Sequence, residues 1–303
     1  VLHLANQGVT INEVHNVYKT PEGIAGNWAN RGYHGSPEHN SRAVINRVLG
    51  YWDANPATLI PLSPADSAPL YVEMMGGAGR IMEKGRELYD AGKYLLAQEI
   101  LNKLVQAEPD NTTARDLLAD VYEQIGYQQE NPGLRNSYLA GAFELRSGIP
   151  GGAQISSSSP DVVRAMSTEL FLDFVAIRMD PKKAKGMEFV VNLITPDNGE
   201  KFVVELRSQT LTNVEGFQAD DPDLTLTINR SDLEAVMGGQ KTLRAMISDG
   251  TATAVGNTDI IGQLASTLVV FDPRFEILPG TAAPPAEAAV NDYEAAGLDP
   301  SGE

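Results

Sequence analysis

The stretch Gly85–Asn111, GRELYDAGKYLLAQEILNKLVQAEPDN, carries the clearest helical pattern in the sequence. Apolar side chains recur every three or four positions on both sides of Ala91-Gly92-Lys93. This spacing predicts two amphipathic helices joined by a short turn. Pro109 is expected to end the second helix, because proline cannot continue one.

Small and aromatic residues in this stretch fall at the spacing of a tetratricopeptide repeat, in which small side chains let helices pack closely. They are Tyr89, Gly92, Tyr94, Ala97, Leu101 and Pro109. The same periodicity predicts further helices over Thr113–Gly126 and Leu134–Arg146. Stacks of this kind usually need about three repeats to bury a core, and the chain has one with a partial neighbour. We therefore expect the exposed face to meet another domain or a second subunit.

Residues 1–70 differ in composition from the helical block, being rich in Gly, Asn and Pro and containing both tryptophans. Apolar residues from Val44 to Leu49 predict one short helix, Ser41–Tyr51, with Ser41 as its N-cap. Four prolines follow, the last of them Pro69, and are expected to interrupt regular structure. The sequence thus predicts a first domain over residues 1–70 and an all-α domain over 71–146.

Residues 147–160, SGIPGGAQISSSSP, have the composition of a linker. Residues 161–280 then mix helix and strand patterns. Asp161–Ile177 predicts one amphipathic helix, and two strands follow with the turn Pro196–Gly199 between them. Asp223–Arg230 alternates apolar and polar residues, as a half-buried strand does. This segment is predicted to be an α+β domain.

Two further signals delimit this domain. Ser231–Glu234 has the pattern of a capping box and predicts the start of a helix. Residues 281–303 are rich in Ala and Pro and contain five acids and no base. We predict a disordered acidic tail there, because so little apolar surface cannot offset the cost of ordering.

Composition excludes several classes of function. The net charge of −17 argues against nucleic acid and against anionic membrane surfaces as partners. The absence of cysteine excludes disulfides and thiolate metal sites. No apolar run approaches the ~20 residues of a membrane span. The chain starts at Val1 without an initiator Met or a signal core, which we interpret as a processed or truncated product.

Three stretches in order resemble one family. The first comprises RGYHG at residues 31–35, HNS at 39–41, LGYWDANP at 49–56 and YVEMMGGA at 71–78. It resembles the end of the catalytic domain of alkylsulfatases that cleave dodecyl sulfate, members of the metallo-β-lactamase superfamily. The helical block resembles that family's dimerisation domain, and residues 161–280 resemble its sterol-carrier-protein-2-like (SCP2-like) domain.

The resemblance implies a multidomain chain in which a remnant of an αββα metallo-β-lactamase domain precedes the all-α and α+β domains. It also implies hydrolysis of sulfate esters of hydrophobic alcohols by two zinc ions. The family's H-x-H-x-D-H metal motif is absent from the sequence. No pair among His3, His15, His34 and His39 has its spacing, so we expect this segment to bind no metal and to be inactive alone.

The resemblance places residues 31–47 at the sulfate end of the parent active site. This region is basic within an acidic protein, with Glu38 as its one acid. An anionic sulfate group needs such a patch. The candidate sulfate-binding residues implied are Tyr33, His39, Asn40 and Arg42. The alternative is that these side chains serve packing or stay solvated.

The α+β domain offers a candidate apolar site between its sheet and its helices. The candidate lining residues are Phe189, Phe202, Leu226, Met237, Met246 and Leu264. Methionine suits an alkyl chain because it packs adaptively. The same residues equally suit an ordinary filled core, and both interpretations stay open here.

The sequence is therefore compatible with three functions. The first is the C-terminal part of an alkylsulfatase, supplying dimerisation, the sulfate-side loop and alkyl-chain binding. The second is a stand-alone SCP2-like carrier of hydrophobic ligands on a helical scaffold, and the third is a pure scaffold for protein contacts. The resemblance favours the first, with a homodimer, an alkyl sulfate ligand and a periplasmic or secreted location.

Overall fold

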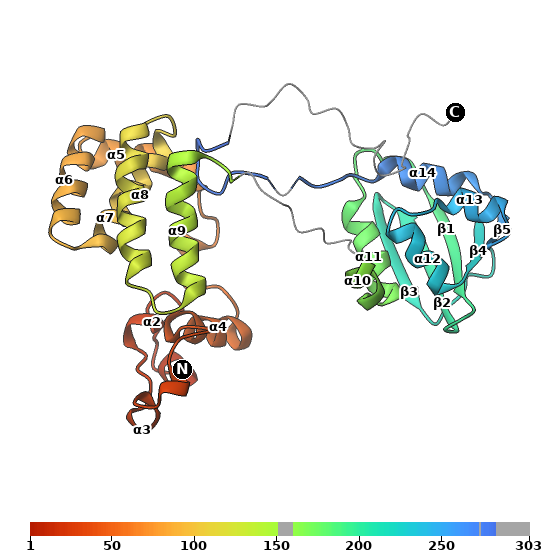
Figure 1. Ribbon diagram of the computed structural model, residues 1–303, viewed down its shortest axis with the longest axis horizontal. Coiled ribbons are helices and arrows are strands. Elements are labelled where there is room, and N and C mark those ends of the chain that lie inside the picture. The colour runs from red at the N-terminus through yellow and green to blue at the C-terminus, as the bar shows by residue number, and fades with distance from the viewer. Residues whose placement is uncertain (151–159, 273, 283–303) are drawn as a thin grey trace. The chain divides into compact units, whose positions relative to one another are not determined.

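The computed structural model describes residues 1–150, 160–272 and 274–282 of the chain. These residues form two compact units (Figure 1). One unit contains residues 1–150 and 274–282, and the other contains residues 160–272. Most of the predicted linker 147–160 and nearly all of the predicted tail 281–303 lie outside the described residues. Each unit is described by itself below.

The first part of the helical unit consists of short helices joined by loops. They are α1 (Leu2–Ala5), α2 (Val14–Val17), α3 (Glu22–Ala25), η1 (Trp28–Asn30), α4 (Pro37–Leu49) and η2 (Pro56–Thr58). The longest, α4, packs against α2 and α1. Ile45 and the fully buried Val14 supply apolar contacts in this small core.

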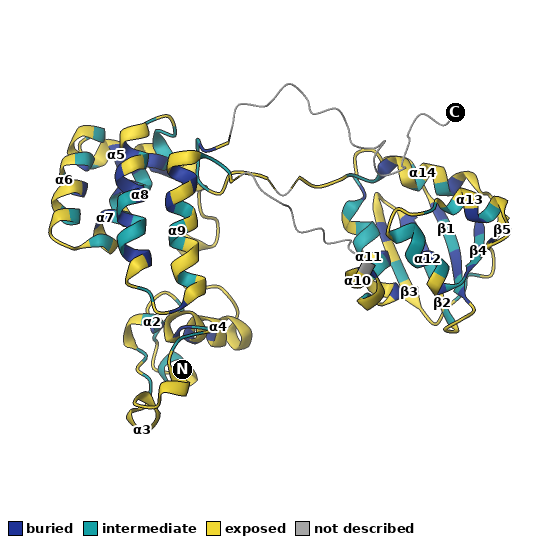
Figure 2. Cartoon of the chain, in the orientation of Figure 1, coloured by how far each residue is buried: buried dark blue, intermediate teal, exposed yellow. Residues whose placement is uncertain are grey.

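Longer helices follow as an antiparallel stack. They are α5 (Pro64–Met74), α6 (Ala78–Asp90), α7 (Tyr94–Ala107), α8 (Thr112–Tyr127) and α9 (Pro132–Ser147). The predicted helix pair around Gly92 is confirmed, as are the two helices after it. Figure 2 shows the buried residues lying along the inner faces of α7 and α8. Leu101, Leu104 and Leu118 are fully buried in this core.

Two local predictions in this unit are wrong. Helix α4 begins at Pro37, with Ser36 as its N-cap accepting a bond from the His39 N–H at 3.3 Å, so Ser41 lies inside the helix. Pro69 lies inside α5 and does not interrupt it. The exposed position of Pro69 explains this, because the carbonyl that lacks a partner there can bind water.

The second unit is built around a five-stranded sheet. Its strands are β1 (Phe189–Thr195), β2 (Glu200–Arg207), β3 (Thr210–Glu215), β4 (Leu224–Ile228) and β5 (Ala252–Gly256). Their order in the sheet is β3-β2-β1-β4-β5. β1 and β4 are parallel and the other neighbours are antiparallel. The structure therefore confirms a helical domain followed by a domain with a mixed sheet.

Helices cover one face of this sheet. They are α10 (Pro160–Ala165), α11 (Thr168–Arg178), α12 (Arg230–Met237), α13 (Leu243–Ser248) and α14 (Asp259–Thr267). The single helix predicted over Asp161–Ile177 is wrong, because the structure divides it into α10 and α11. Ser167 caps α11 by accepting a bond from the Leu170 N–H at 3.1 Å. Within the described residues, no helix is both long and apolar enough to span a membrane.

Candidate functional site

A cavity of about 560 Å³ lies in the first part of the helical unit. Its walls come from the loop Arg31–Gly35, the first turns of α4, and the loop residues Tyr18 and Thr20. Polar and apolar side chains share the lining, since Asn40 and Val44 lie one turn apart on the same face of α4. The cavity therefore has an apolar wall beside groups that can bind an anion.

Two glycines shape the loop that forms this cavity. A Cβ atom on Gly32 would lie 2.9 Å from the carbonyl oxygen of Gly35. A Cβ atom on Gly35 would lie 3.2 Å from the side-chain amide of Asn40. The loop can close on itself, and Asn40 can lie over it, because neither position carries a side chain.

The structure divides the four candidate sulfate-binding residues into two pairs. Tyr33 and Asn40 line the cavity together. His39 and Arg42 are exposed on α4, three residues apart and so on one face of the helix, and are not among the lining residues. The cavity thus unites the neutral donors, while the two basic side chains lie beside it on α4.

Two other basic residues do line the cavity. His34 and Arg31 belong to the basic region predicted from the sequence. Arg31 forms an ion pair with Glu130, and its guanidinium lies 5.8 Å from the centre of the Tyr33 ring. Arg31 thereby links the loop to the turn before α9 and lies beside the Tyr33 ring. The sequence did not predict that Tyr18 and Thr20 line the cavity, because loop positions carry no periodic signal.

The candidate apolar residues of the second unit lie together in its core. Phe189, Phe202, Leu226 and Met246 are buried, and Met237 and Leu264 are partly buried residues packed against them. Phe202 and Met246 are only 1% and 2% exposed. The six residues thus form part of one packed cluster, with Met237 and Leu264 at its edge.

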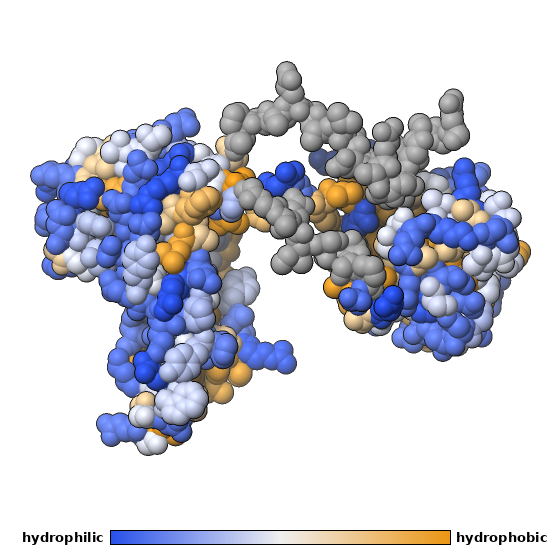
Figure 3. Space-filling model, in the orientation of Figure 1, coloured by the Kyte–Doolittle hydropathy of each residue, from blue (hydrophilic) through white to orange (hydrophobic). Residues whose placement is uncertain are grey.

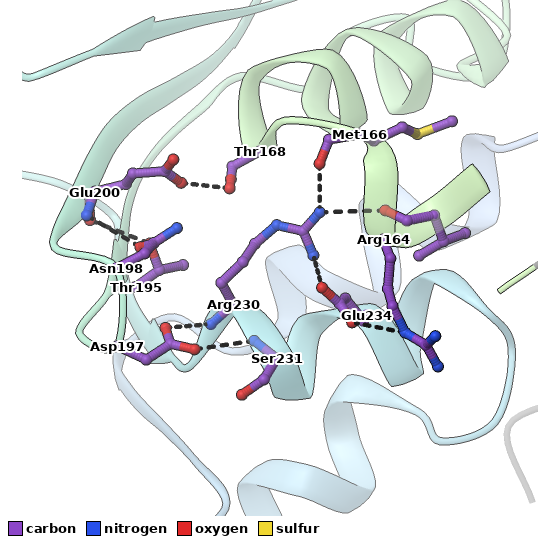
Figure 4. Close-up of polar contacts among 11 residues, drawn as sticks. Arg164, Met166, Thr168, Thr195, Asp197, Asn198, Glu200, Arg230, Ser231 and Glu234 are labelled. Atoms are coloured by element: carbon purple, nitrogen blue, oxygen red, sulfur yellow. Dashed lines mark hydrogen bonds and ion pairs between the residues drawn. The ribbon is translucent and has the colours of Figure 1, made fainter. Parts of the chain in front are cut away.

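A buried arginine organises the same unit near α10 (Figure 4). Arg230 donates to the carbonyl oxygens of Met166 at 2.8 Å and Val163 at 3.4 Å, and pairs with Glu234 at 3.3 Å. Because these partners satisfy the guanidinium, we assign it a structural role. It ties α10 to α12.

The start of α12 differs from the predicted capping box. Asn229 occupies the N-cap position, and Asp197 of the β1–β2 turn accepts bonds from the N–H groups of Arg230 and Ser231 at 2.6 and 3.1 Å. Burial alone would raise the pKa of Asp197, but these bonds outweigh it and lower the pKa below its ordinary value. The prediction of Ser231 as cap is wrong because a distant carboxylate takes its place.

A segment beyond the second unit, residues 274–282, belongs to the helical unit. The Glu144 carboxylate accepts bonds from the N–H groups of Ile277 and Leu278 at 2.8 and 3.0 Å. Arg115 donates to the carbonyl oxygen of Gly280 at 2.5 Å, and Leu278 packs on the helical core. We refer to residues 276–282 as the return segment. Sequence reasoning missed it, since nothing local marks such a contact.

Among the residues that the structure describes, no group of three or more His, Asp or Glu side chains could hold a metal ion. The residues present therefore do not fit a zinc site, and we derive no chemical step through zinc here.

The chain thus has a helical domain, which contains the cavity, and an α+β domain, which contains the mixed sheet. Residues 10–148 match the family model for alkyl sulfatase dimerisation, and residues 156–280 match the model for the alkyl sulfatase C-terminal domain. The chain therefore contains, in order, the two domains that form the C-terminal part of alkylsulfatases.

Curated relatives agree with this assignment. The chain is 40% identical over 277 residues to a linear primary-alkylsulfatase of Pseudomonas sp., covering 91% of the chain and 41% of that protein. It is 35% identical over 277 residues to an alkyl/aryl-sulfatase of Saccharomyces cerevisiae, covering 91% of the chain and 42% of that protein. The chain thus spans less than half the length of these relatives and matches their C-terminal part.

Solved structures show the same likeness. The stereoselective inverting sec-alkylsulfatase Pisa1 from Pseudomonas sp. superposes with a TM-score of 0.81 and 36% identity, over 91% of this chain and 43% of that one. A palmitated SCP2-like protein of Aedes aegypti is 28% identical over 33% of this chain and 93% of that one, with a TM-score of 0.29.

Proposed function

We propose that this chain is the C-terminal part of a zinc-dependent alkylsulfatase that hydrolyses sulfate esters of hydrophobic alcohols, such as dodecyl sulfate. The observation that carries the proposal is the match of two alkyl sulfatase domains, in order, to residues 10–148 and 156–280. In this proposal the chain supplies dimerisation, the sulfate-side loop and alkyl-chain binding. The two zinc ions are held by a part of the enzyme outside these residues.

The cavity beside Tyr33 is the proposed sulfate end of the active site. The Tyr33 hydroxyl and the Asn40 amide can donate hydrogen bonds to sulfate oxygens. Arg31 in the lining and Arg42 on α4 add positive charge near the cavity, and the imidazoles of His34 and His39 can donate hydrogen bonds. These groups would bind and orient the ester. Residues 1–70 are proposed to be a remnant of the metallo-β-lactamase domain, although the dimerisation model already matches from residue 10.

The alkyl chain is proposed to bind in the second unit, as an SCP2-like domain would bind it. The core around Phe189, Phe202, Leu226 and Met246 is closed, so a ligand must displace the residues at its edge. Met237 can move most easily, because it is unbranched and follows at the end of α12. A fluorescent fatty acid that binds the chain and is displaced by dodecyl sulfate would support this site. The Met237→Trp variant should not bind the fluorescent fatty acid.

A homodimer is part of the same proposal. Leu70 and Met74 are 62% and 77% exposed on α5, and Leu95 is 65% exposed on α7, which packs against α5. Figure 3 shows further apolar side chains over α9. Such surface is typical of subunit contacts. Sedimentation of the chain should give a dimer, and Leu70→Lys with Met74→Lys should give a monomer.

We also propose a periplasmic or secreted location, from the resemblance to the alkylsulfatase family.

The experiment that tests the function uses the chain joined to the catalytic portion found in full-length relatives. Zinc content is measured first, and sulfate release from dodecyl sulfate second. We expect Asn40→Ala and Tyr33→Phe to lower kcat/KM, with Asn46→Ala on the exposed side of α4 as the control. A zinc-loaded protein without sulfatase activity would overturn the proposal.

A further inference from the structure

Helix α11 is apolar on both of its faces. Leu172, Val175 and Met179 pack into the core of the second unit. Leu170 and Ile177 are 53% and 66% exposed on the opposite side, with the partly buried Phe174 between them. The spacing of these three residues, four and then three positions, makes them one stripe along the helix. The outer side of α11 thus carries an apolar stripe beside the exposed Glu169 and Asp173, and such a stripe is typical of a contact surface.

The chain beyond α14 extends the stripe. The N–H of Val269 donates to the carbonyl oxygen of Arg178 at 2.9 Å, and the Arg178 guanidinium donates back to the carbonyl oxygen of Val269 at 2.9 Å. This pairing places the next residues, Val270 and Phe271, beside the end of α11. They are 66% and 58% exposed. The apolar surface therefore continues from α11 onto a second segment of the same unit.

A basic loop adjoins this apolar surface. It follows α11 directly and contains Lys182, Lys183 and Lys185, all exposed. Ala184 between them is fully buried in the core, and its N–H donates to the carbonyl oxygen of Asp180 at 3.1 Å. The loop is thereby anchored while its lysines extend into solvent. Residues 178–188 carry four bases and two acids in a chain whose net charge is −17.

Acidic groups near the stripe do not cancel this charge. Asp173, on the same side of α11, accepts a bond from the Asn213 amide at 2.7 Å and is thereby directed toward β3. Asp180 accepts a bond from the N–H of Lys182 at 2.8 Å and so belongs to the loop's own turn. The overall charge repels anions at long range, but charges act mainly within about 10 Å in salt. At contact, the attraction depends on the loop 182–185 itself, which holds three lysines and no acid.

We propose that this surface binds the second unit to aggregates of an anionic amphiphile, namely alkyl sulfate micelles. We define it as the α11 surface: Leu170, Phe174, Ile177, Val270 and Phe271 with the loop 182–185. The apolar residues enter the alkyl region and the lysines meet the sulfate groups, the combination by which peripheral proteins bind anionic interfaces. The proposal rests on the proposed function, because that function makes alkyl sulfates the ligand, and it names the form in which they are met.

Binding is measured with the chain as it stands, by gel filtration with micelles of a neutral maltoside detergent with or without a minor fraction of dodecyl sulfate. We expect comigration only with the mixed micelles, weakening as salt rises. The triple variant Lys182→Glu, Lys183→Glu, Lys185→Glu should bind about 100-fold more weakly. Ile177→Ser with Phe271→Ser should also weaken binding, through lost apolar contact.

The matched control carries Lys84→Glu, Lys93→Glu and Lys103→Glu in the helical unit, which changes the net charge equally. We expect it to bind as the unmodified chain does. Equal binding by both triple variants would overturn the proposal, as would binding to vesicles of anionic phospholipid but not to the mixed micelles. Circular dichroism confirms that each variant is folded.

Failure of this inference differs from failure of the proposed function. Hydrolysis of a short-chain alkyl sulfate that forms no micelles needs no interface. The extended enzyme with the 182–185 triple variant should retain that activity while losing activity on micellar substrate. Unchanged micelle binding by the 182–185 triple variant, with hydrolysis of both substrates intact, would overturn the α11 surface alone. Absence of hydrolysis with micelle binding intact would overturn the function and leave the surface as an anionic-amphiphile site.

Discussion

The Glu144 carboxylate accepts a hydrogen bond from the Thr281 hydroxyl at 2.7 Å, although 137 positions separate the two residues. The same oxygen accepts the N–H groups of Ile277 and Leu278. One buried carboxylate on α9 thus holds the return segment on the helical unit.

Replacing Glu144 should release the return segment. Glu144→Gln keeps the shape but weakens three bonds to a charged acceptor, and we expect a loss of about 2 kcal/mol in the free energy of unfolding. Hydrogen exchange at Ile277 and Leu278 should accelerate. Thr281→Val should cost about 1 kcal/mol. Glu83→Gln, on the exposed side of α6, serves as the control, and unchanged exchange in Glu144→Gln would contradict the assignment.

Gly85 sets how closely α6 approaches α7. A Cβ atom there would lie 2.8 Å from Leu101, which is fully buried. We expect Gly85→Ala to destabilise the helical unit by about 1 to 3 kcal/mol through overpacking. Gly79 on the same helix has nothing within 4 Å of a Cβ position. Gly79→Ala should therefore be neutral or stabilising, and equal urea midpoints for the two variants would refute the close contact.

Tyr122 should make the helical unit sensitive to alkali. Burial, with a smaller contribution from the nearby Tyr138 phenol, raises the pKa of Tyr122 from 10.0 to about 12. The folded state thus favours the neutral phenol. Its contribution is complete below pH 10 and is lost as the pH rises toward 12.

Urea unfolding at neutral and alkaline pH measures this effect. We expect the alkaline loss to shrink by about 2 kcal/mol in Tyr122→Phe. Tyr127→Phe, on an exposed residue of the same helix, should leave the loss unchanged. An alkaline transition identical in all three proteins would count against the role of Tyr122.

Arg230 should hold α10 in place. Arg230→Met leaves the carbonyl oxygens of Val163 and Met166 without their donor, and we expect a loss of about 2 kcal/mol and faster proteolysis around α10. Arg164→Met removes a mostly exposed arginine whose ion pairs are 3.7 and 4.0 Å long. Its cost should stay below about 0.5 kcal/mol. Similar losses in both variants would argue against a buried clamp.

Local patterns predicted most of the secondary structure. The alternation in Asp223–Arg230 and the helical spacing around Gly92 reflect which face each residue buries, which the sequence records directly. Two of the failures have a common cause. Asp197 replaces the predicted cap of α12, and Glu144 binds the return segment, through contacts between residues far apart in the chain. No pattern within a short window reports such contacts.

The candidate site was predictable only in part, because the sequence records which residues are basic but not which of them meet in space. A cluster of basic residues within an acidic chain is visible in the sequence, and Tyr33 and Asn40 do line one cavity. Which basic side chains enter it depends on the phase of α4, which begins at Pro37 and not at Ser41. Because residues 37–40 are helical, Asn40 lies on the same face as Val44 and lines the cavity, whereas His39 and Arg42 lie on the neighbouring face.

Sulfate release from dodecyl sulfate by the zinc-loaded extended protein tests the central claim most directly. The account predicts hydrolysis by the unmodified protein and a fall in kcat/KM of about tenfold or more for Asn40→Ala, as expected when a hydrogen bond to a charged group is lost. Asn46→Ala should retain full activity. Equal activity of Asn40→Ala and Asn46→Ala would contradict the assignment of the cavity, and no hydrolysis by any of them would contradict the function.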